Sequence, residues 1–259
     1  MFPCAERHMD TLYSAMASVY DMLFPLNPEC IAALEALTAK IATSPPVLLD
    51  LGAANGSLVR ALRSRGWEAL GIEIEPAMTE RAGAHVITGR MQNALSIAEH
   101  QILPVLAEKI DGRPSAFFDA IVCLGNTLPH LEPSARSRFF NDIKSMLKPS
   151  APFIIQTLNY DRPDIGPGFV FPDISAGNVR FSRRYEQGPM PESLSFVTRL
   201  RIECEIHEDR TVLYPLSPRS LQALLSERGF ERIDWYSGWN LKPFDAGKDM
   251  YCICVARAP

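Results

Sequence analysis

The chain has 259 residues, 47% of them hydrophobic and 22% charged, the composition of a globular protein that can bury a core without disulfides or metals. With 26 basic and 30 acidic residues the formal net charge is −4, which gives no support for a nucleic-acid partner. No apolar run reaches about 18 residues, and the first ten residues lack the apolar core of a secretory signal, so we expect no membrane span. The six cysteines show neither a CxxC pair nor zinc-ligand spacing, so we expect no metal site and a cytoplasmic protein.

Strands and helices alternate along most of the chain. Residues 8–43 have helical spacing that is broken at Pro25 and Pro28. Strands are predicted for the apolar runs at 47–51, 69–74, 86–88, 120–124 and 153–158, and helices for the segments at 57–65, 76–84, 92–110 and 134–148. Runs that are apolar on both faces are typical of strands buried in a parallel sheet, so the alternation predicts an α/β fold built from βαβ units.

The pattern changes after residue 160. Residues 161–178 are rich in proline and glycine and predict a loop. Nearly strict alternation over 194–206 predicts one long, half-exposed antiparallel strand, with partners at 179–185 and 211–216. A helix at 217–228 and strands at 232–236 and 250–256 follow. We therefore expect three parts: an N-terminal helical cap (1–43), an α/β domain (44–160 and 215–259), and an antiparallel β insertion (161–214) that forms a lid.

The loop after the first strand carries the strongest local signal, Asp50-Leu51-Gly52-Ala53-Ala54-Asn55-Gly56-Ser57. Ligands of open α/β sheets bind at this end of the strands, where glycine lets the backbone approach a ligand closely. The G-x-x-x-G spacing lacks the G-x-G-x-x-G of dinucleotide sites and the G-K-[ST] of P-loops. The acid that precedes the first glycine would repel a pyrophosphate and suits an ammonium group.

A second acid closes the next predicted strand. Glu73 lies 23 positions after Asp50, where an acid typically accepts both hydroxyls of a ribose. The two acids together describe a ligand with a ribose and a cationic amine but no diphosphate. S-adenosylmethionine fits that description.

These segments resemble the motifs of class I S-adenosylmethionine-dependent methyltransferases. V-L-L-D-L-G-A-A-N-G-S-L resembles the first motif, G-I-E-I-E-P-A-M the second, V-I-T-G-R-M-Q the third-strand segment and F-D-A-I-V-C-L-G-N-T-L-P-H-L the fourth. The last of these, with L-N-Y-D downstream, is similar to the glycine N-methyltransferase-like branch, and A-S-V-Y-D-M-L-F resembles a cofactor-capping segment. The resemblance implies a Rossmann-like, mostly parallel sheet of seven strands with the last strand antiparallel, and methyl transfer to a small molecule.

The resemblance also implies roles for individual residues. The cofactor-binding residues would be Tyr20 above the site, Asp50, Gly52, Ala53, Asn55 and Gly56 at the methionine end, Glu73, Ile74 and Met78 around the adenosine, Met91 and Gln92 near the adenine ring, and Leu124 and Gly125 beside the sulfonium. Asn126 would help to hold the substrate. Ala53 replaces the usual Cys or Gly, and Arg90 stands where the family often has an acid that binds the adenine amino group.

Methyl transfer from a sulfonium is an in-line displacement, in which the protein mainly positions the nucleophile. An oxygen nucleophile usually needs a base, whereas an amine need only be neutral, so a catalytic base is not required. We favour N-methylation over O-methylation. The candidate catalytic residues are Asn126, His130 and Tyr160. His130 is either a base or a hydrogen-bonded structural residue, and Tyr160 either contacts the substrate or packs in the core.

Other interpretations stay open at this stage. Arg183, Arg184, Arg199 and Arg201 either hold a substrate carboxylate or form a solvated face, and Trp235, Tyr236 and Trp239 either edge a pocket or pack in the core. The alternative functions are methylation of a protein or RNA, non-catalytic binding of S-adenosylmethionine, and a nicotinamide-dependent oxidoreductase. The acceptor, the methylated atom and the choice between monomer and homodimer are not determined.

Overall fold

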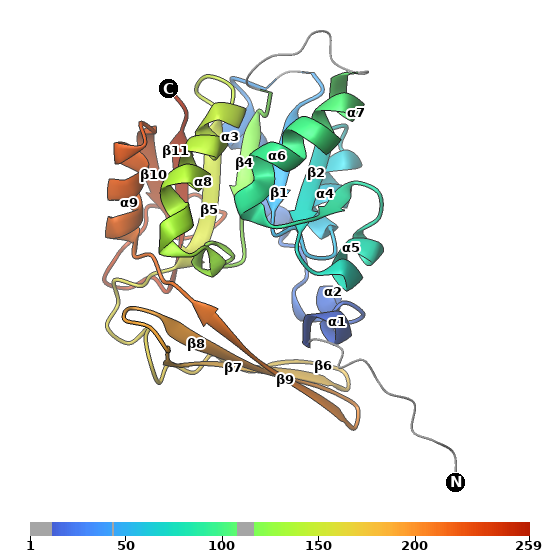
Figure 1. The fold of residues 1–259 in the computed structure, drawn as a ribbon, viewed down its shortest axis with the longest axis vertical. Helices are drawn as coiled ribbons and strands as arrows, with labels where there is room; N and C mark the ends of the chain where they lie inside the picture. Colours follow the sequence, from blue (N-terminus) through green and yellow to red (C-terminus); the bar gives the residue numbers. More distant parts are fainter. Residues whose placement is uncertain (1–11, 43, 108–116) are drawn as a thin grey trace.

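The computed structural model describes residues 12–42, 44–107 and 117–259. Its centre is a seven-stranded sheet in the order β10-β11-β5-β4-β1-β2-β3, and a second, four-stranded sheet lies across one end of it (Figure 1). The strands of the central sheet are β1 (Val47–Leu51), β2 (Glu68–Glu73), β3 (Val86–Thr88), β4 (Ala120–Cys123), β5 (Pro152–Leu158), β10 (Glu231–Tyr236) and β11 (Tyr251–Arg257). Strands β1 to β5 pair in parallel, and β11 pairs antiparallel with both β5 and β10. The predicted Rossmann-like sheet is confirmed.

Helices cover both faces of the central sheet because its inner strands are apolar on both sides. All five residues of β1 are buried. Leu49 of β1 belongs to a core with α6 (Ala94–Ile97), α8 (Pro133–Met146) and α9 (Pro218–Glu227), whereas Leu48 belongs to one with α3 (Pro28–Thr38) and α4 (Ser57–Arg63). This division follows from the alternation of side chains along a strand.

Three helices begin with the same local device, a capping side chain followed by proline at the first helical position. Asn27 accepts a hydrogen bond from the backbone N–H of Glu29 at the start of α3 (2.9 Å), and Ser217 accepts one from Ser220 at the start of α9 (3.2 Å). Glu75 caps α5 (Pro76–Ala82) in the same way. Such caps satisfy the unpaired N–H groups of the first turn, and proline loses no hydrogen bond there. In place of the helix predicted at 92–110, the structure has four short pieces, η1 (Met91–Asn93), α6, η2 (Ala98–Ile102) and α7 (Leu103–Ala107). Residues 108–110 of that prediction lie outside the described residues.

The insertion differs from its prediction in strand boundaries. Its sheet consists of β6 (Ile174–Ala176), β7 (Val179–Gln187), β8 (Leu194–Ile202) and β9 (Glu205–Leu213), so the single strand expected at 194–206 is wrong. The chain reverses at Glu203, which has a φ of +53°, and Ile206 is 49% exposed. The alternation of residue types continued by chance through a hairpin turn that carries no glycine, asparagine or proline. The partner strand expected at 211–216 is β9, and β6 lies within the expected loop.

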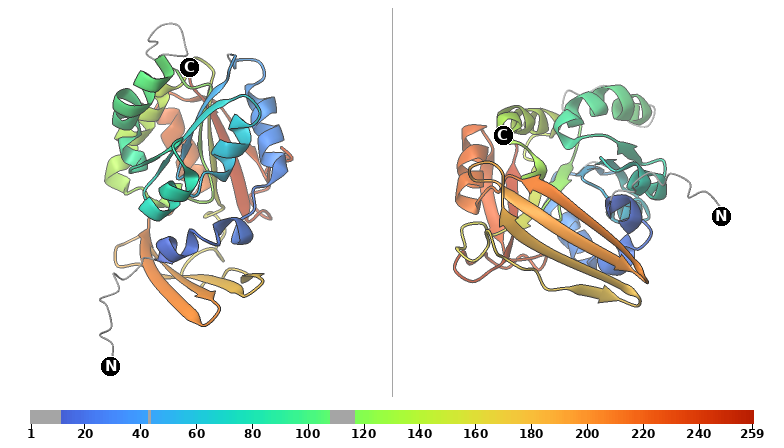
Figure 2. Two further views of the ribbon diagram at one scale, coloured as in Figure 1. Left: turned by 90° about the vertical axis from the view of Figure 1, so that its right-hand side faces the viewer. Right: turned by 60° about the horizontal axis from the view of Figure 1, so that its bottom comes forward.

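The N-terminal helices connect the two sheets. Helices α1 (Leu12–Met16) and α2 (Tyr20–Leu23) lie between the α/β layers and the insertion (Figure 2, left). Their apolar side chains form one cluster with Met78 of α5 and with Phe181 and Leu200 of the insertion. The described residues contain no helix that is long and apolar enough to cross a membrane. The division of the chain into cap, α/β domain and insertion stays a prediction.

Candidate functional site

The glycine loop connects β1 to α4 at the end of the central sheet that faces the insertion (Figure 1). The backbone N–H groups of Gly52 and Ala53 both donate to the carbonyl of Ile72, at 2.8 and 3.1 Å. Gly52 has a φ of +80°, and a Cβ there would lie 2.6 Å from the Cγ2 of Thr127. Glycine is therefore required at this position both by the backbone conformation and by the close approach of Thr127.

Glu73 lies beside this loop at the end of β2. Its carboxylate accepts hydrogen bonds from the backbone N–H groups of Ala54 (2.9 Å) and Glu75 (3.0 Å). A carboxylate has about four acceptor positions, so two can still receive the hydroxyl groups of a ribose. The carboxylate thus orders the loop and faces the ligand that the loop would bind.

Asp50 is the most unusual charged group of the site. It is 4% exposed at the end of β1, and its carboxylate makes no hydrogen bond or ion pair with another described residue. Burial and, to a smaller extent, the nearby charge of Glu73 together raise its pKa to about 7. A buried carboxylate without a partner is costly, and the ammonium group of S-adenosylmethionine would supply the missing counter-charge.

The other residues expected around the cofactor lie in different surroundings. Tyr20 of α2 is close enough to Glu73 and Asp50 that burial, together with these charges, raises its pKa. Asn55 is buried and accepts a hydrogen bond from Ser57 (2.7 Å). The remaining members are Gly56 at the N-terminus of α4, the exposed Ile74 and Gly125, the partly buried Gln92 and Leu124, and Met78 and Met91, which lie in hydrophobic clusters. Arg90 is exposed.

Asn126 follows β4 and joins three elements through its amide. Its Nδ2 donates to the hydroxyls of Tyr160 (2.9 Å) and Tyr185 (3.2 Å), and its Oδ1 accepts from Thr157 Oγ1 (2.9 Å) and the N–H of Leu158 (3.2 Å). The two tyrosine hydroxyls lie 3.0 Å apart. We call Asn126, Tyr160 and Tyr185 the Asn126 cluster. Tyr185, from β7, was not expected in the site, and its partners are too distant in sequence for any local pattern to indicate them.

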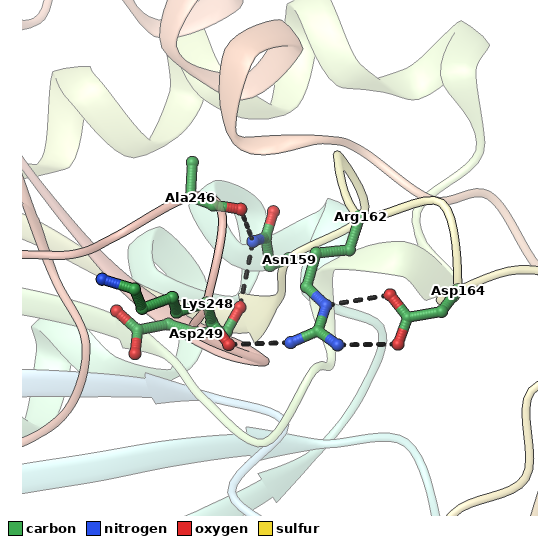
Figure 3. A network of polar contacts seen from close by, with 6 residues as sticks. All are labelled: Asn159, Arg162, Asp164, Ala246, Lys248 and Asp249. Atoms are coloured by element: carbon green, nitrogen blue, oxygen red, sulfur yellow. Dashed lines mark hydrogen bonds and ion pairs between the residues drawn. The ribbon is translucent and has the colours of Figure 1, made fainter.

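The segment that leaves β5 is held in place next to Tyr160. Asn159 Nδ2 donates to the carbonyls of Ala246 (2.9 Å) and Asp249 (3.0 Å) in the loop between β10 and β11 (Figure 3). Arg162 makes a bidentate pair with Asp164 and donates to the carbonyl of Lys248 (2.7 Å) (Figure 3). These contacts fix the backbone on both sides of Tyr160, so the phenol has a defined position at the edge of the site.

His130 ends the short helix η3 (Leu128–His130) and is exposed. Surrounding protein atoms lower its pKa, whereas the charge of Asp209 on β9 acts in the opposite direction. The two elements are joined where the N–H of Tyr214 donates to the carbonyl of Pro129 (2.8 Å). The short helix η3 therefore lies against the insertion, and His130 is close enough to Asp209 for that charge to act on the imidazole.

The arginines of the insertion divide into two groups. Arg184 and Arg199 form ion pairs with Glu186 and Glu208, and Arg201 donates to the carbonyl of Glu203, as expected for a solvated outer face. Arg183 instead points inward, with its guanidinium 4.8 to 5.9 Å from the ring centroids of Phe24, Phe171 and Phe181. Its position is that of a cation packed among aromatic rings.

The remaining candidates from the sequence pack in the core. Trp235 donates to Gln222 (3.0 Å), Trp239 is buried against the α3 and α4 side of the sheet, and Cys252 and Cys254 are fully buried. Tyr236 is partly buried in the same core. Among the described residues, no group of three or more His, Cys, Asp or Glu side chains has the arrangement of a metal site.

A family model described as a methyltransferase domain matches residues 26–234, most of the chain. This chain belongs to the class I S-adenosylmethionine-dependent methyltransferases. The match decides against the oxidoreductase considered above. S-adenosylmethionine is the cofactor. The assignment of its amine to Asp50 and of its ribose to Glu73 stays a prediction.

This methyltransferase shares its fold with several solved structures. The CcbJ methyltransferase from Streptomyces caelestis has a TM-score of 0.71 at 20% identity, covering 96% of this chain and 98% of that one. A methyltransferase from Clostridium acetobutylicum has a TM-score of 0.70 at 12% identity, covering 95% and 98%. S-adenosylmethionine-bound CalS10 from Micromonospora echinaspora, an amino pentose methyltransferase, has a TM-score of 0.63 at 16% identity, covering 94% and 96%. At these identities the likeness concerns the fold alone.

Curated relatives match a shorter part of the chain. The carboxy-S-adenosyl-L-methionine synthase of Yersinia enterocolitica is 28% identical over 118 residues, which are 45% of this chain and 41% of that protein. The corresponding protein of Yersinia pestis is 26% identical over 137 residues, 53% of this chain and 44% of the relative. The chain thus spans less than half the length of these relatives.

Replacing Glu73 with alanine is expected to weaken S-adenosylmethionine binding by about 1–3 kcal/mol, because a charged hydrogen-bond acceptor for the ribose is lost. Titration calorimetry measures the change, and Glu80→Ala on the exposed side of α5 serves as the control. An affinity unchanged by Glu73→Ala would remove Glu73 from the site.

Proposed function

We propose that this methyltransferase transfers the methyl group of S-adenosylmethionine to a small molecule, with nitrogen favoured over oxygen as the methylated atom. The observation that carries the proposal is the insertion, whose inner face covers the end of the sheet where the glycine loop, Glu73 and Asn126 lie (Figure 1). Such a cover suits an acceptor small enough to be enclosed between two sheets. The similarity to the glycine N-methyltransferase-like branch is part of this proposal.

The alternative of a protein or RNA acceptor has less support. Three of the four insertion arginines singled out above lie on the outer face, where two pair with glutamates and one donates to a backbone carbonyl. Acids outnumber cations next to the site, since Asp50, Glu73 and Asp209 lie there together with the inward-facing Arg183. An acidic site does not favour a nucleic-acid phosphate backbone. The names of CalS10, an amino pentose methyltransferase, and KedS8, a sugar N-methyltransferase, are consistent with a small amine as acceptor.

The proposed mechanism assigns a separate task to each side of the site. When bound, S-adenosylmethionine supplies a methyl group already activated by its sulfonium. Asp50 would hold the amino group of the cofactor and Glu73 its ribose. His130 receives the proton that the acceptor must lose, and the Asn126 cluster holds the insertion in place so that water is excluded. Positioning of this kind can lower a barrier by about 7–11 kcal/mol.

A metabolite screen tests the proposed function. The enzyme is incubated with S-adenosylmethionine and pools of small amines, small alcohols, total protein or total RNA, and S-adenosylhomocysteine is measured. We expect production with the amine pool. Production with protein or RNA alone would support the alternative, and cofactor binding without production from any pool would indicate a non-catalytic role.

A further inference from the structure

Asp209 lies on the inner face of the insertion, opposite the functional site. It pairs in register with Thr198 of β8, which is buried, and directly opposed residues of neighbouring strands point to the same side of a sheet. Its chain neighbours Glu208 and Arg210 are exposed on the outer face, in ion pairs with Arg199 and Glu186. Asp209 therefore belongs to the inner face of the strand, whereas its two chain neighbours belong to a paired, solvated outer surface.

The Asp209 carboxylate has no cationic partner in the described part of the chain. One of its oxygens accepts a hydrogen bond from Thr211 Oγ1 (2.9 Å), and no lysine or arginine side chain lies within ion-pair distance. Arg183, which also points inward, is enclosed by the aromatic rings of Phe24, Phe171 and Phe181. An inward-facing acid whose nearest partner is a neutral hydroxyl can still receive a cation.

Three elements bring their polar groups to the same space. The charge of Asp209 acts on Tyr13 of α1 and on His130 of η3, and burial together with the charges of Asp209 and Glu73 raises the pKa of Tyr13 to about 12. Tyr13 thus faces acids of both sheets, one from the cofactor side and one from the insertion. Helix α1 and the short helix η3, which carry Tyr13 and His130, both contact β9, so Asp209 lies on the side of the insertion that faces these two residues.

We propose that Asp209 binds the ammonium group of the acceptor and makes this methyltransferase selective for amines over alcohols. The inference rests on the proposed function and names its substrate class, a small aliphatic amine that is cationic in solution. Asp209 attracts the ammonium ion, and its charge stabilises His130 as that residue takes the proton. The neutral amine then attacks the methyl carbon, so a nitrogen–carbon bond forms while the carbon–sulfur bond breaks and its electron pair stays on sulfur. Asp209 is thus a specificity-determining residue, and His130 receives the proton.

The substitution Asp209→Asn tests the proposal, because it keeps the shape of the side chain and removes its charge. The probes are a pool of small primary amines and a matched pool in which hydroxyl groups replace the amino groups. Binding of each pool to the full-length enzyme with S-adenosylhomocysteine is measured by ligand-detected NMR, and turnover separately by S-adenosylhomocysteine release. We expect the wild type to prefer amines at least tenfold and Asp209→Asn to lose that preference, while affinity for S-adenosylhomocysteine changes less than twofold. Glu208→Gln on the outer face is the matched control and should keep the preference.

A second readout does not depend on the acceptor. Because the negative charge of Asp209 raises the pKa of His130, Asp209→Asn should make the His130 imidazole titrate at lower pH, as followed by NMR and assigned with His130→Gln. The proposal is overturned if neither pool binds the wild type, if amines and alcohols bind equally, or if Asp209→Asn keeps the preference. Selective binding of amines without their methylation would instead overturn the proposed function and leave the assignment of Asp209 standing.

Discussion

Asp50→Asn is expected to stabilise the cofactor-free protein at pH 8. Burial raises the pKa of Asp50 to about 7, above the ordinary value of 3.8, so the folded protein binds more protons than the unfolded chain between these two pH values. The contribution of Asp50 to the free energy of unfolding is fully present below the pKa that the group has in the unfolded chain. It is lost as the pH rises through the pKa that the group has in the folded protein. At about 1.4 kcal/mol for each pKa unit, the cost of ionising Asp50 at pH 8 reaches up to about 4 kcal/mol. Asparagine cannot ionise and avoids this cost.

Urea unfolding at pH 4 and pH 8 measures the free energy of unfolding of the wild type and of the variant. The other titrating groups contribute equally to both proteins, so their effect is absent from the difference. We expect nearly equal stability at pH 4, where Asp50 is largely neutral, and a more stable variant at pH 8. Equal stabilities at both pH values would mean that the carboxylate is not buried without a partner.

The same substitution is expected to weaken S-adenosylmethionine binding by about 2–5 kcal/mol, because the ammonium group loses its counter-charge inside the protein. In the wild type, binding favours the ionised form of Asp50 and so releases a proton. Affinity should therefore rise as pH increases from about 5.5 to 7, and calorimetry in buffers of different ionisation enthalpy should detect the released proton. Asp50→Asn should show neither effect. A pH dependence that survives in the variant would have to come from another group.

The residues proposed for the cofactor side of the site could be chosen from the sequence because their signals are local. Asp50, Gly52 and Gly56 lie within one strand–loop–helix unit, and Glu73 follows at the end of the next strand. The parallel pairing of β1 with β2 then brings them together, as the alternation of elements predicted. A pattern that spans about 25 residues and depends on backbone geometry can be recognised without knowing the rest of the fold.

The acceptor side could not be predicted in the same way. Tyr185 reaches Asn126 across 59 residues, and Asp209 faces His130 from a strand whose boundaries the sequence misplaced. Within an antiparallel sheet, moving a strand by one residue turns every side chain to the other face, so inward and outward residues cannot be assigned until the hairpin turns are known. The turn at Glu203 has no glycine, asparagine or proline to indicate it.

Asn126→Ala is expected to reduce turnover far more than cofactor affinity. The amide is engaged by the hydroxyls of Tyr160 and Tyr185 on one side and by Thr157 and Leu158 on the other. Its loss leaves the hydroxyl of Tyr185, a side chain that is 1% exposed, with Tyr160 as its remaining partner. We expect a loss of about 1–3 kcal/mol of stability, and a fall in kcat of about a hundredfold, because small displacements near a reacting centre have effects of that size. The affinity for S-adenosylmethionine should change little, since Asp50 and Glu73 are untouched.

Two further variants test whether Asn126 acts on turnover through its contact with the insertion or through its contacts within the α/β domain. Tyr185→Phe removes the hydroxyl through which β7 of the insertion contacts Asn126, whereas Thr157→Val removes a contact of Asn126 within the α/β domain. If the Asn126 cluster acts by holding the insertion over the site, Tyr185→Phe should lower kcat more than Thr157→Val at similar loss of stability. A fall in cofactor affinity without a fall in kcat for Asn126→Ala would place Asn126 on the cofactor. If all three variants had the same kcat as the wild type, the contact between the two sheets would have no effect on the reaction. The Asn126 cluster would then contribute to the stability of the fold alone.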